Sequence, residues 1–201
     1  MLQLRNRDKN IINFIQNYGY LSIQQCADIF YKDHKMKYDE SRKRLRQLYN
    51  NKLINRLIIS NNKCIYIDLN DNRKKLNWHR YYLIQFYCLL IKYGAIKTFI
   101  KEYEFKDMGI RSDGFCELIY NNKLITMFIE IDYSHNTQID RYDKLYEDGR
   151  IQDYYLKKYN QSIFPEVVIV KENIPKRITE SDNYNIIYLD FSLSNFERVL
   201  N

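Results

Sequence analysis

The chain has 201 residues, of which 45% are hydrophobic and 28% are charged, with only five glycines and two prolines. This length and composition suit one large or two small packed domains and exclude a disordered or low-complexity chain. The formal charge of +7 is unevenly divided: residues 1–80 hold 17 Lys and Arg against 7 Asp and Glu, a balance of +10, and residues 81–201 hold 15 against 18, a balance of −3. A basic first part favours a polyanionic partner, joined to a second part with another role.

Four cysteines are widely spaced, with no CxxC pair and no neighbouring pair of histidines: Cys26, Cys64, Cys88 and Cys116. This spacing argues against a zinc site and against a disulfide framework. Polar residues near the N-terminus interrupt any apolar run, and no stretch approaches the roughly 20 apolar residues that span a bilayer. We therefore expect a cytoplasmic protein with no signal peptide, no membrane partner and free thiols.

Two helices are predicted in the first 30 residues. Apolar residues recur at helical spacing over residues 7–18, and Gly19 suits the left-handed conformation that often ends a helix. Ser22 then favours a second helix over residues 23–30, because its hydroxyl can accept hydrogen bonds from the exposed amides of a first turn.

A third helix, beginning at Asp39 or Ser41, is the most basic stretch of the chain. Leu45, Leu48 and Tyr49 are expected to face inward. The residues expected on the outer face, as a DNA-binding surface, are Arg42, Lys43, Arg44, Arg46 and Gln47. A helix fits the major groove, where Arg can pair with guanine and Gln with adenine while other cations neutralise phosphates. The alternative is a merely solvated basic face.

Two β-prone runs follow, at residues 53–59 and 64–67, with an Asn-rich tetrad between them that suits a hairpin turn. Three helices followed by a hairpin is the order of a winged helix-turn-helix, so we expect a domain of this kind, binding double-stranded DNA, over residues 1–71. Arg56 on the first strand and Lys63 at the turn are placed to reach phosphates. A lysine in a polar turn is, however, often only solvated.

The second part of the chain begins after a polar junction near Asp71. An aromatic helix over residues 78–93 lies within an expected connecting segment, residues 72–95, which serves as a linker, as a dimerisation surface or as the first helix of the next domain. Beyond it, strands are expected near residues 98–105, 114–120, 124–132, 166–170 and 186–189, and helices over 137–159 and 193–200. This order predicts a small α/β domain over residues 96–201, and an α+β fold for the whole chain.

Three carboxylates are the main candidates for chemistry in this domain. Glu130 and Asp132 are two residues apart in an apolar run, so both side chains point to one face of the expected strand. If Asp113 begins the neighbouring strand, the three carboxylates converge, which is costly unless a cation binds them. They are therefore candidate Mg²⁺ ligands of a phosphodiesterase site. The alternative is a strand end whose carboxylates pair with nearby cations such as Arg141.

Over about residues 7–170 the chain resembles the replication-relaxation family of plasmids and phages. The resemblance is carried by Arg111-Ser112-Asp113-Gly114, by Phe128-Ile129-Glu130-Ile131-Asp132 and by Arg141-Tyr142-Asp143-Lys144-Leu145. It implies a winged helix followed by a domain similar to the PD-(D/E)xK nuclease fold.

The sequence departs from that nuclease pattern at one position. An active site of this kind has a lysine two residues after the acid of its central strand, where it stabilises charge on the phosphate. Asp132 occupies that position here, so Lys144 or Arg141 would have to supply the cation. The candidate catalytic set is therefore Asp113, Glu130, Asp132 and Lys144, and the alternative is a nuclease-like domain used for binding or assembly.

These observations together predict a sequence-specific double-stranded DNA-binding protein of a plasmid or phage. The resemblance implies that it acts at a replication or transfer origin, as an initiator or accessory factor alongside replication or relaxosome proteins. A homodimer is expected, because one winged helix reads few base pairs. Two alternatives stay open: a magnesium-dependent endonuclease, and a transcriptional repressor with the same winged helix. Only the endonuclease would need a cofactor, Mg²⁺.

Overall fold

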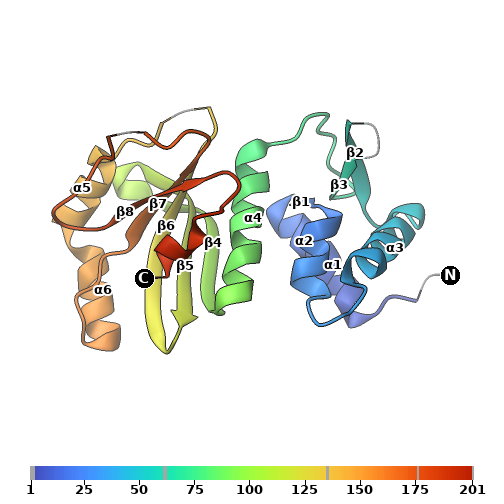
Figure 1. Ribbon diagram of the computed structural model, residues 1–201, viewed down its shortest axis with the longest axis horizontal. Coiled ribbons are helices and arrows are strands. Elements are labelled where there is room, and N and C mark those ends of the chain that lie inside the picture. The colour runs from blue at the N-terminus through green and yellow to red at the C-terminus, as the bar shows by residue number, and fades with distance from the viewer. Residues whose placement is uncertain (1–2, 61–62, 135, 176, 201) are drawn as a thin grey trace. The chain divides into compact units, whose positions relative to one another are not determined.

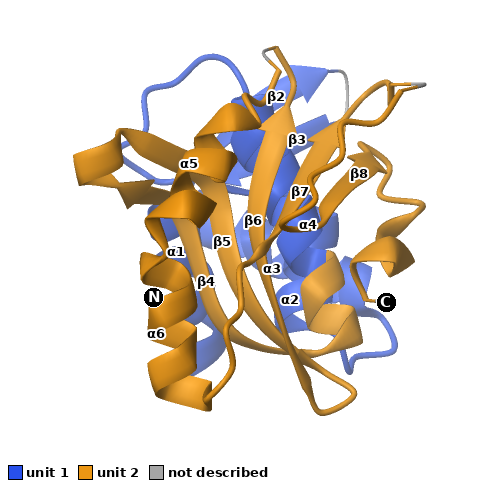
Figure 2. Cartoon of the chain, turned by 90° about the vertical axis from the view of Figure 1, so that its left-hand side faces the viewer, with its two compact units in different colours: residues 1–88 blue, residues 89–201 orange. Residues whose placement is uncertain are grey.

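The computed structural model describes residues 3–60, 63–134, 136–175 and 177–200 (Figure 1). The chain divides into two compact units, residues 1–88 and 89–201 (Figure 2). Each unit contains helices and strands, so the fold is of mixed α and β type. Within the described ranges, no helix combines the length and the apolar character needed to cross a bilayer.

Unit 1 begins with three helices, α1 (Asn6–Tyr18), α2 (Ile23–Phe30) and α3 (Lys37–Asn50). Gly19 ends α1 with a φ of 89°, and its amide donates to the Ile15 carbonyl. At the start of α2, the Gln25 amide donates to Ser22 Oγ over 3.1 Å, and the Ser22 amide donates to Gln25 Oε1 over 2.9 Å. This reciprocal capping satisfies two amides that the first turn leaves unpaired.

α3 begins at Lys37, before the expected start at Asp39 or Ser41. Asp39 and Glu40 lie in its first turn, where negative side chains interact favourably with the positive end of the helix dipole. With the helix beginning at Lys37, the cluster Arg42, Lys43, Arg44 and Arg46 lies in its middle rather than at its start.

Three strands complete this unit: β1 (Tyr20–Leu21), β2 (Asn55–Ser60) and β3 (Lys63–Ile67). They form an antiparallel sheet in the order β1-β3-β2, so β2 and β3 form the expected hairpin. Asn61 and Asn62 of the expected turn lie outside the described residues. The sequence did not predict β1, because its two buried residues are defined by pairing with Ile67 and Tyr66, more than 40 positions away.

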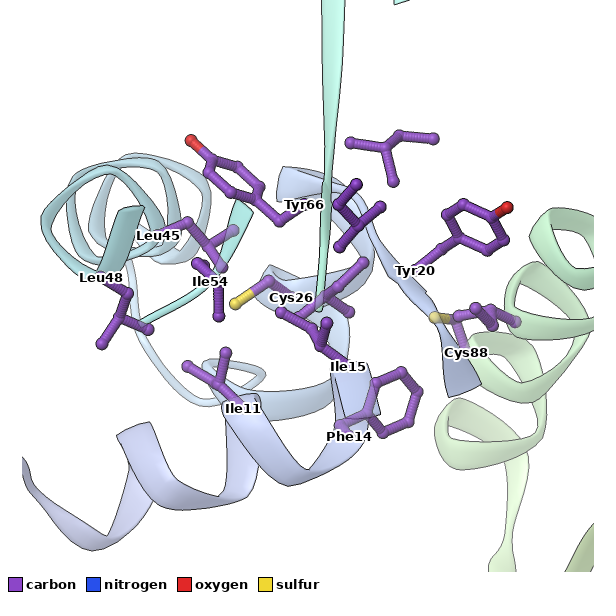
Figure 3. Packing of buried hydrophobic residues seen from close by; sticks show 14 of the residues in the cluster. Ile11, Phe14, Ile15, Tyr20, Cys26, Leu45, Leu48, Ile54, Tyr66 and Cys88 are labelled. Atoms are coloured by element: carbon purple, nitrogen blue, oxygen red, sulfur yellow. The ribbon is translucent and has the colours of Figure 1, made fainter. Parts of the chain in front are cut away.

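One apolar cluster holds unit 1 together (Figure 3). Ile11 and Ile15 of α1 pack with Leu45 and Leu48 of α3, and all four side chains are fully buried. Two residues of α4 (Trp78–Tyr93), Ile84 and Cys88, belong to the same cluster. The first part of α4 is therefore core of unit 1. The two units divide between residues 88 and 89, inside the expected connecting segment, rather than at the polar junction near Asp71.

Unit 2 is built on a five-stranded sheet in the order β4-β5-β6-β7-β8. Its strands are β4 (Ala95–Phe105), β5 (Ile110–Tyr120), β6 (Lys123–Asp132), β7 (Glu166–Lys171) and β8 (Ile186–Asp190). β4, β5 and β6 are antiparallel neighbours, whereas β6, β7 and β8 run parallel. Parallel neighbours need a crossover, and between β6 and β7 it contains two helices. The chain ends with a short 3₁₀ turn, η2 (Phe196–Val199), within the expected closing helix.

The crossover helices are α5 (Asp140–Asp148) and α6 (Arg150–Tyr159), where the sequence predicted one helix over residues 137–159. Gly149 breaks the helix with a φ of 77°, a conformation that other residues rarely adopt. α5 and α6 cover one face of the sheet (Figures 1 and 2). Tyr142 packs there against Phe128 of the sheet, and Tyr155 belongs to the same buried cluster. Because side chains alternate along a strand, Glu130 lies on this same covered face.

Candidate functional site

Three cations of α3 are exposed to solvent: Arg42, Lys43 and Arg46. The Arg42 guanidinium lies 3.1 Å from the Asp39 carboxylate, and the two side chains are 63% and 53% exposed. An ion pair as exposed as this one is weak and easily exchanged, since water screens both charges. The middle of α3 therefore presents a positive surface that a polyanion can reach.

Arg44 does not lie on that surface, contrary to the sequence-based expectation. Its side chain is 16% exposed, and its Nε donates to Oδ1 of Asp8 over 2.6 Å while Nη2 donates to Oδ2. Nη1 donates to Gln47 Oε1 over 2.8 Å and Nη2 to the Gln3 carbonyl over 3.1 Å. Arg44 thus joins α3 to α1, and Gln47 is turned toward the same network rather than outward. Sequence periodicity missed this because the partner, Asp8, lies in another helix.

Asp8 is the buried partner that fixes Arg44. Its side chain is 2% exposed, and the Arg5 amide also donates to it over 2.6 Å. Burial alone would raise the pKa of the Asp8 carboxyl, but the hydrogen bonds and charge of Arg44 outweigh that effect and lower the pKa below its ordinary value. Asp8 is therefore ionised at neutral pH, and the pair is a charge-assisted, two-pronged clamp between two helices.

The hairpin adds two exposed cations, Arg56 on β2 and Lys63 on β3. The Arg56 guanidinium lies 4.5 Å from the ring centre of Tyr49 in α3, a cation–π contact that links the hairpin to the helix. Burial raises the pKa of the Tyr66 hydroxyl to about 12, while the charges of Arg56 and Arg46 act in the opposite direction. The contact with Tyr49 is what places the Arg56 cation of the hairpin beside α3. We call Arg42, Lys43, Arg46, Arg56 and Lys63 the basic face.

Two further cations near α3 escaped the sequence reasoning. Arg5 and Arg7 precede and begin α1, and with Lys43 and His34 they line a cavity of about 580 Å³. The Arg7 guanidinium lies 4.3 Å from the ring centre of Tyr31, and Nη2 is 3.1 Å from Nε2 of His34. The Arg-x-Arg pair was visible in the sequence. Its position beside α3 was not, because that depends on how the helices pack.

In unit 2 the structure brings two of the three predicted carboxylates close together. Gly114 lies opposite Ile129 in the β5–β6 pair, so Asp113 and Glu130 come next along the strands and share the covered face. Asp113 is half-buried, and its Oδ2 accepts from the Ile131 amide over 2.8 Å. Its negative charge contributes to raising the pKa of Glu130, as expected for neighbouring acids.

Two residues of α5 already contact the Glu130 carboxylate. The Arg141 guanidinium lies 2.5 Å from Glu130 Oε1, and the Tyr142 hydroxyl donates to the same oxygen. Burial, at 6% exposure, raises the pKa of the Glu130 carboxyl to about 7, against the lowering effects of Arg141 and Tyr142. The ion pair with Arg141 is the arrangement that the sequence offered as the alternative to metal binding.

Asp132 is held by other partners. Thr137 Oγ1 donates to its Oδ1 over 2.6 Å, and Lys171 Nζ lies 3.3 Å from its Oδ2. Lys171, opposite Asp132 in the parallel β6–β7 pair, is the lysine nearest to this carboxylate in sheet register, and the sequence reasoning missed it. Of the two residues that the sequence offered as the cation, Arg141 pairs with Glu130, and Lys144 is exposed on α5.

The predicted metal ligands do not form a metal-binding group. Among the described residues, no three His, Cys, Asp or Glu side chains are arranged to hold an ion. A divalent cation at Glu130 would have to displace Arg141 and the Tyr142 hydroxyl from a buried carboxylate. The residues therefore do not fit the Mg²⁺ that the resemblance implies.

Comparisons of the chain with protein-family models, with curated proteins and with solved structures find no match.

Proposed function

We propose that unit 1 binds double-stranded DNA, with α3 in the major groove and the β2–β3 hairpin as the wing of a winged helix-turn-helix. The observation that carries this proposal is the basic face: five exposed cations on one helix and one hairpin. The width of a helix matches the major groove, and exposed Arg and Lys side chains neutralise phosphates on either side.

The scaffold behind the basic face supports the same conclusion. Arg44 and Asp8 clamp α3 to α1, and Arg56 stacks on Tyr49 between hairpin and helix. A recognition element that is already rigid loses little conformational entropy when it binds. The Arg44–Asp8 clamp therefore contributes to binding indirectly, by fixing the helix that carries Arg42 and Arg46.

The biological role rests on the resemblance to the replication-relaxation family. On that basis we propose that this is a protein of a plasmid or phage that acts at a replication or transfer origin. It acts there as a homodimeric initiator or accessory factor, together with replication or relaxosome proteins. A repressor with the same winged helix differs only in the DNA site that it recognises. Sedimentation of the free and DNA-bound chain tests the dimer, and selection of binding sites from a random duplex pool tests the role.

Binding itself is tested by titrating a labelled duplex with the full chain and following fluorescence anisotropy. Between about 50 and 200 mM salt, the affinity is expected to fall linearly on a log–log plot with a slope near −0.9 for each neutralised phosphate. If each of the five cations of the basic face neutralises one phosphate, the slope reaches its steepest value, about −4 to −5. A chain that is folded but binds no duplex at about 50 mM salt would contradict the proposal.

Unit 2 serves, in this proposal, as a binding or assembly domain rather than a nuclease. The support is that Glu130 and Asp132 are neutralised by the chain's own cations, Arg141 and Lys171. Incubation of supercoiled plasmid with the chain in Mg²⁺ or Mn²⁺ is expected to leave the plasmid intact. Nicking by the parent chain that Asp113→Ala abolishes would instead establish the endonuclease.

A further inference from the structure

The cavity that Arg5 and Arg7 line lies wholly within unit 1, with a volume of about 580 Å³. Its wall contains the cations Arg5, Arg7, Lys43 and Arg44 and the acids Asp8 and Glu40, so positive charge is in excess. Part of the wall consists of exposed side chains: Arg5, Asn6, His34, Glu40 and Lys43. The cavity is therefore open to solvent, and its charge balance favours an anion.

The two arginines at the start of α1 keep the capacity to bind that anion. Both oxygens of the Asp8 carboxylate accept from Arg44, so Asp8 is already paired. The Arg7 guanidinium lies 4.3 Å from the ring centre of Tyr31, a contact that does not cancel its charge. Over the described ranges, neither Arg5 nor Arg7 forms an ion pair with a carboxylate. The planar donors of a guanidinium match two oxygens of a phosphate.

The cavity and the hairpin lie beside different sides of α3. One side of the helix is a stripe of residues spaced three and four positions apart, all of which line the cavity: Glu40, Lys43, Arg44 and Gln47. By the same spacing, Arg42, Arg46 and Tyr49 form a second stripe. Tyr49 contacts Arg56 of the hairpin. In Figure 1 the hairpin and the start of the chain lie on opposite sides of α3, so cations of two other segments border its exposed surface.

A helix in the major groove lies between the two sugar–phosphate backbones that border the groove. The hairpin cations Arg56 and Lys63 are on the side of one backbone. We propose that the cavity receives a phosphate of the other backbone, held by Arg5, Arg7 and Lys43. This contact rests on the proposed function of unit 1, and it assigns the second side of the groove.

Loss of both arginine charges tests the contact. With Arg5 and Arg7 added to the five cations of the basic face, the salt slope of the parent can reach about −6. Arg5→Gln/Arg7→Gln is expected to weaken duplex binding at about 100 mM salt by at least about tenfold and to reduce the slope by about two. Because Arg7 packs on a buried ring and its loss can disturb folding, Arg5→Gln alone is the second variant. Its side chain is exposed, and the slope should fall by about one.

Lys9→Gln/Lys32→Gln is the matched control. Both lysines are exposed residues of unit 1 outside the cavity lining, and the variant removes the same charge as Arg5→Gln/Arg7→Gln. It is expected to change the affinity by a factor of about two or less. Equal losses in the two double variants would show that only the net charge of unit 1 matters, and would overturn the proposal.

A duplex in which single phosphates are replaced by neutral methylphosphonates, one position at a time, locates the contact. The parent is expected to lose affinity at positions on both sides of the groove. Arg5→Gln/Arg7→Gln should become insensitive on one side only, and Arg56→Ala/Lys63→Ala on the other. A parental profile in a folded Arg5→Gln/Arg7→Gln variant would overturn this contact and leave the proposed function standing. A parent that binds no duplex would contradict both.

Inorganic phosphate distinguishes a free anion from a DNA phosphate as the occupant. Calorimetric titration of the full chain at constant ionic strength is expected to show weak binding, with a Kd of about 1 mM or above, that saturating duplex abolishes. Phosphate binding that persists at saturating duplex and is lost in Arg5→Gln/Arg7→Gln would assign the cavity to a small phosphorylated ligand and overturn the proposal.

Discussion

The two units differ in whether the charges of their candidate site residues are balanced by other side chains of the chain. In unit 1 the cations of the basic face are exposed. Arg42 forms an ion pair with Asp39 that water screens, and Arg56 contacts the ring of Tyr49. In unit 2 the carboxylates of Glu130 and Asp132 are buried or half-buried and are paired with Arg141 and Lys171. A cluster of like charges in a sequence therefore indicates a binding site only when the folded chain does not neutralise it. The same contrast exists within α3, where Arg44 is neutralised and Arg46 is exposed.

The largest effect is expected on stability, from Arg44→Ala. Removing the guanidinium leaves the Asp8 carboxylate buried without its partner, and breaking such a pair typically costs about 3 kcal/mol. Thermal or urea unfolding should therefore show a marked loss in the free energy of unfolding of unit 1. Arg42→Ala on the same helix is the control and should change it by about 0.5 kcal/mol or less. Equal stability of the two variants would mean that the clamp is not a structural element.

The next effect is expected on DNA affinity, from the double variant Arg42→Ala/Arg46→Ala. Both side chains are exposed, so the fold should be kept while two phosphate or base contacts are lost. Duplex affinity at about 100 mM salt should fall at least tenfold, and the salt slope should decrease by about two. Lys123→Ala/Lys144→Ala removes two exposed cations of unit 2 and should leave both values unchanged. The contrast between the units fails if the two double variants behave alike.

A third effect is expected on the pH dependence of unit 2. Because burial raises the pKa of Glu130 from its ordinary 4.5 to about 7, the folded chain binds a proton more tightly than the unfolded chain. The stability that this proton contributes is complete below about pH 4.5 and is lost as the pH rises through about 7. Glu130→Gln should remove this component of the decline, as measured by urea unfolding at pH 5, 6, 7 and 8. An unchanged pH profile in the variant would show that Glu130 remains ionised throughout.

The smallest effect is expected from Lys63→Ala on the hairpin. A single exposed phosphate contact contributes little affinity, so the change should be a few-fold at most and the salt slope should fall by about one. Anisotropy titrations in parallel with the parent measure both quantities. A loss as large as that of Arg42→Ala/Arg46→Ala would mean that the hairpin, and not α3, is the principal contact.

Sequence reasoning located most elements because their signals are local. The spacing of Ile11 and Ile15, the Ser22 cap and the polar tetrad at residues 60–63 each depend on a few neighbouring residues, and the structure contains the corresponding helices and hairpin. Gly149 was also a local signal for a helix break, but the apolar periodicity continues on both sides of it, so the sequence predicted one helix instead of two.

The ion-pair partners of the charged side chains could not be predicted from such local signals. Whether Arg44 faces water or Asp8, and whether Asp132 meets Lys144 or Lys171, depends on pairs separated by 36 and 39 positions. Such pairs are set by how α1 packs on α3 and how β6 aligns with β7, and one sequence contains no direct measure of either. The cavity beside Arg5 and Arg7 escaped notice for the same reason, because residues of α1 and α3 together form its wall.

The most direct test of the central claim is to follow backbone amide resonances of the full chain by NMR as duplex DNA is added. If α3 and the hairpin form the contact, the largest shifts should occur at residues 42–46 and at Arg56 and Lys63, with unit 2 little changed. Shifts concentrated in unit 2, with residues 42–46 unaffected at saturating duplex, would contradict it.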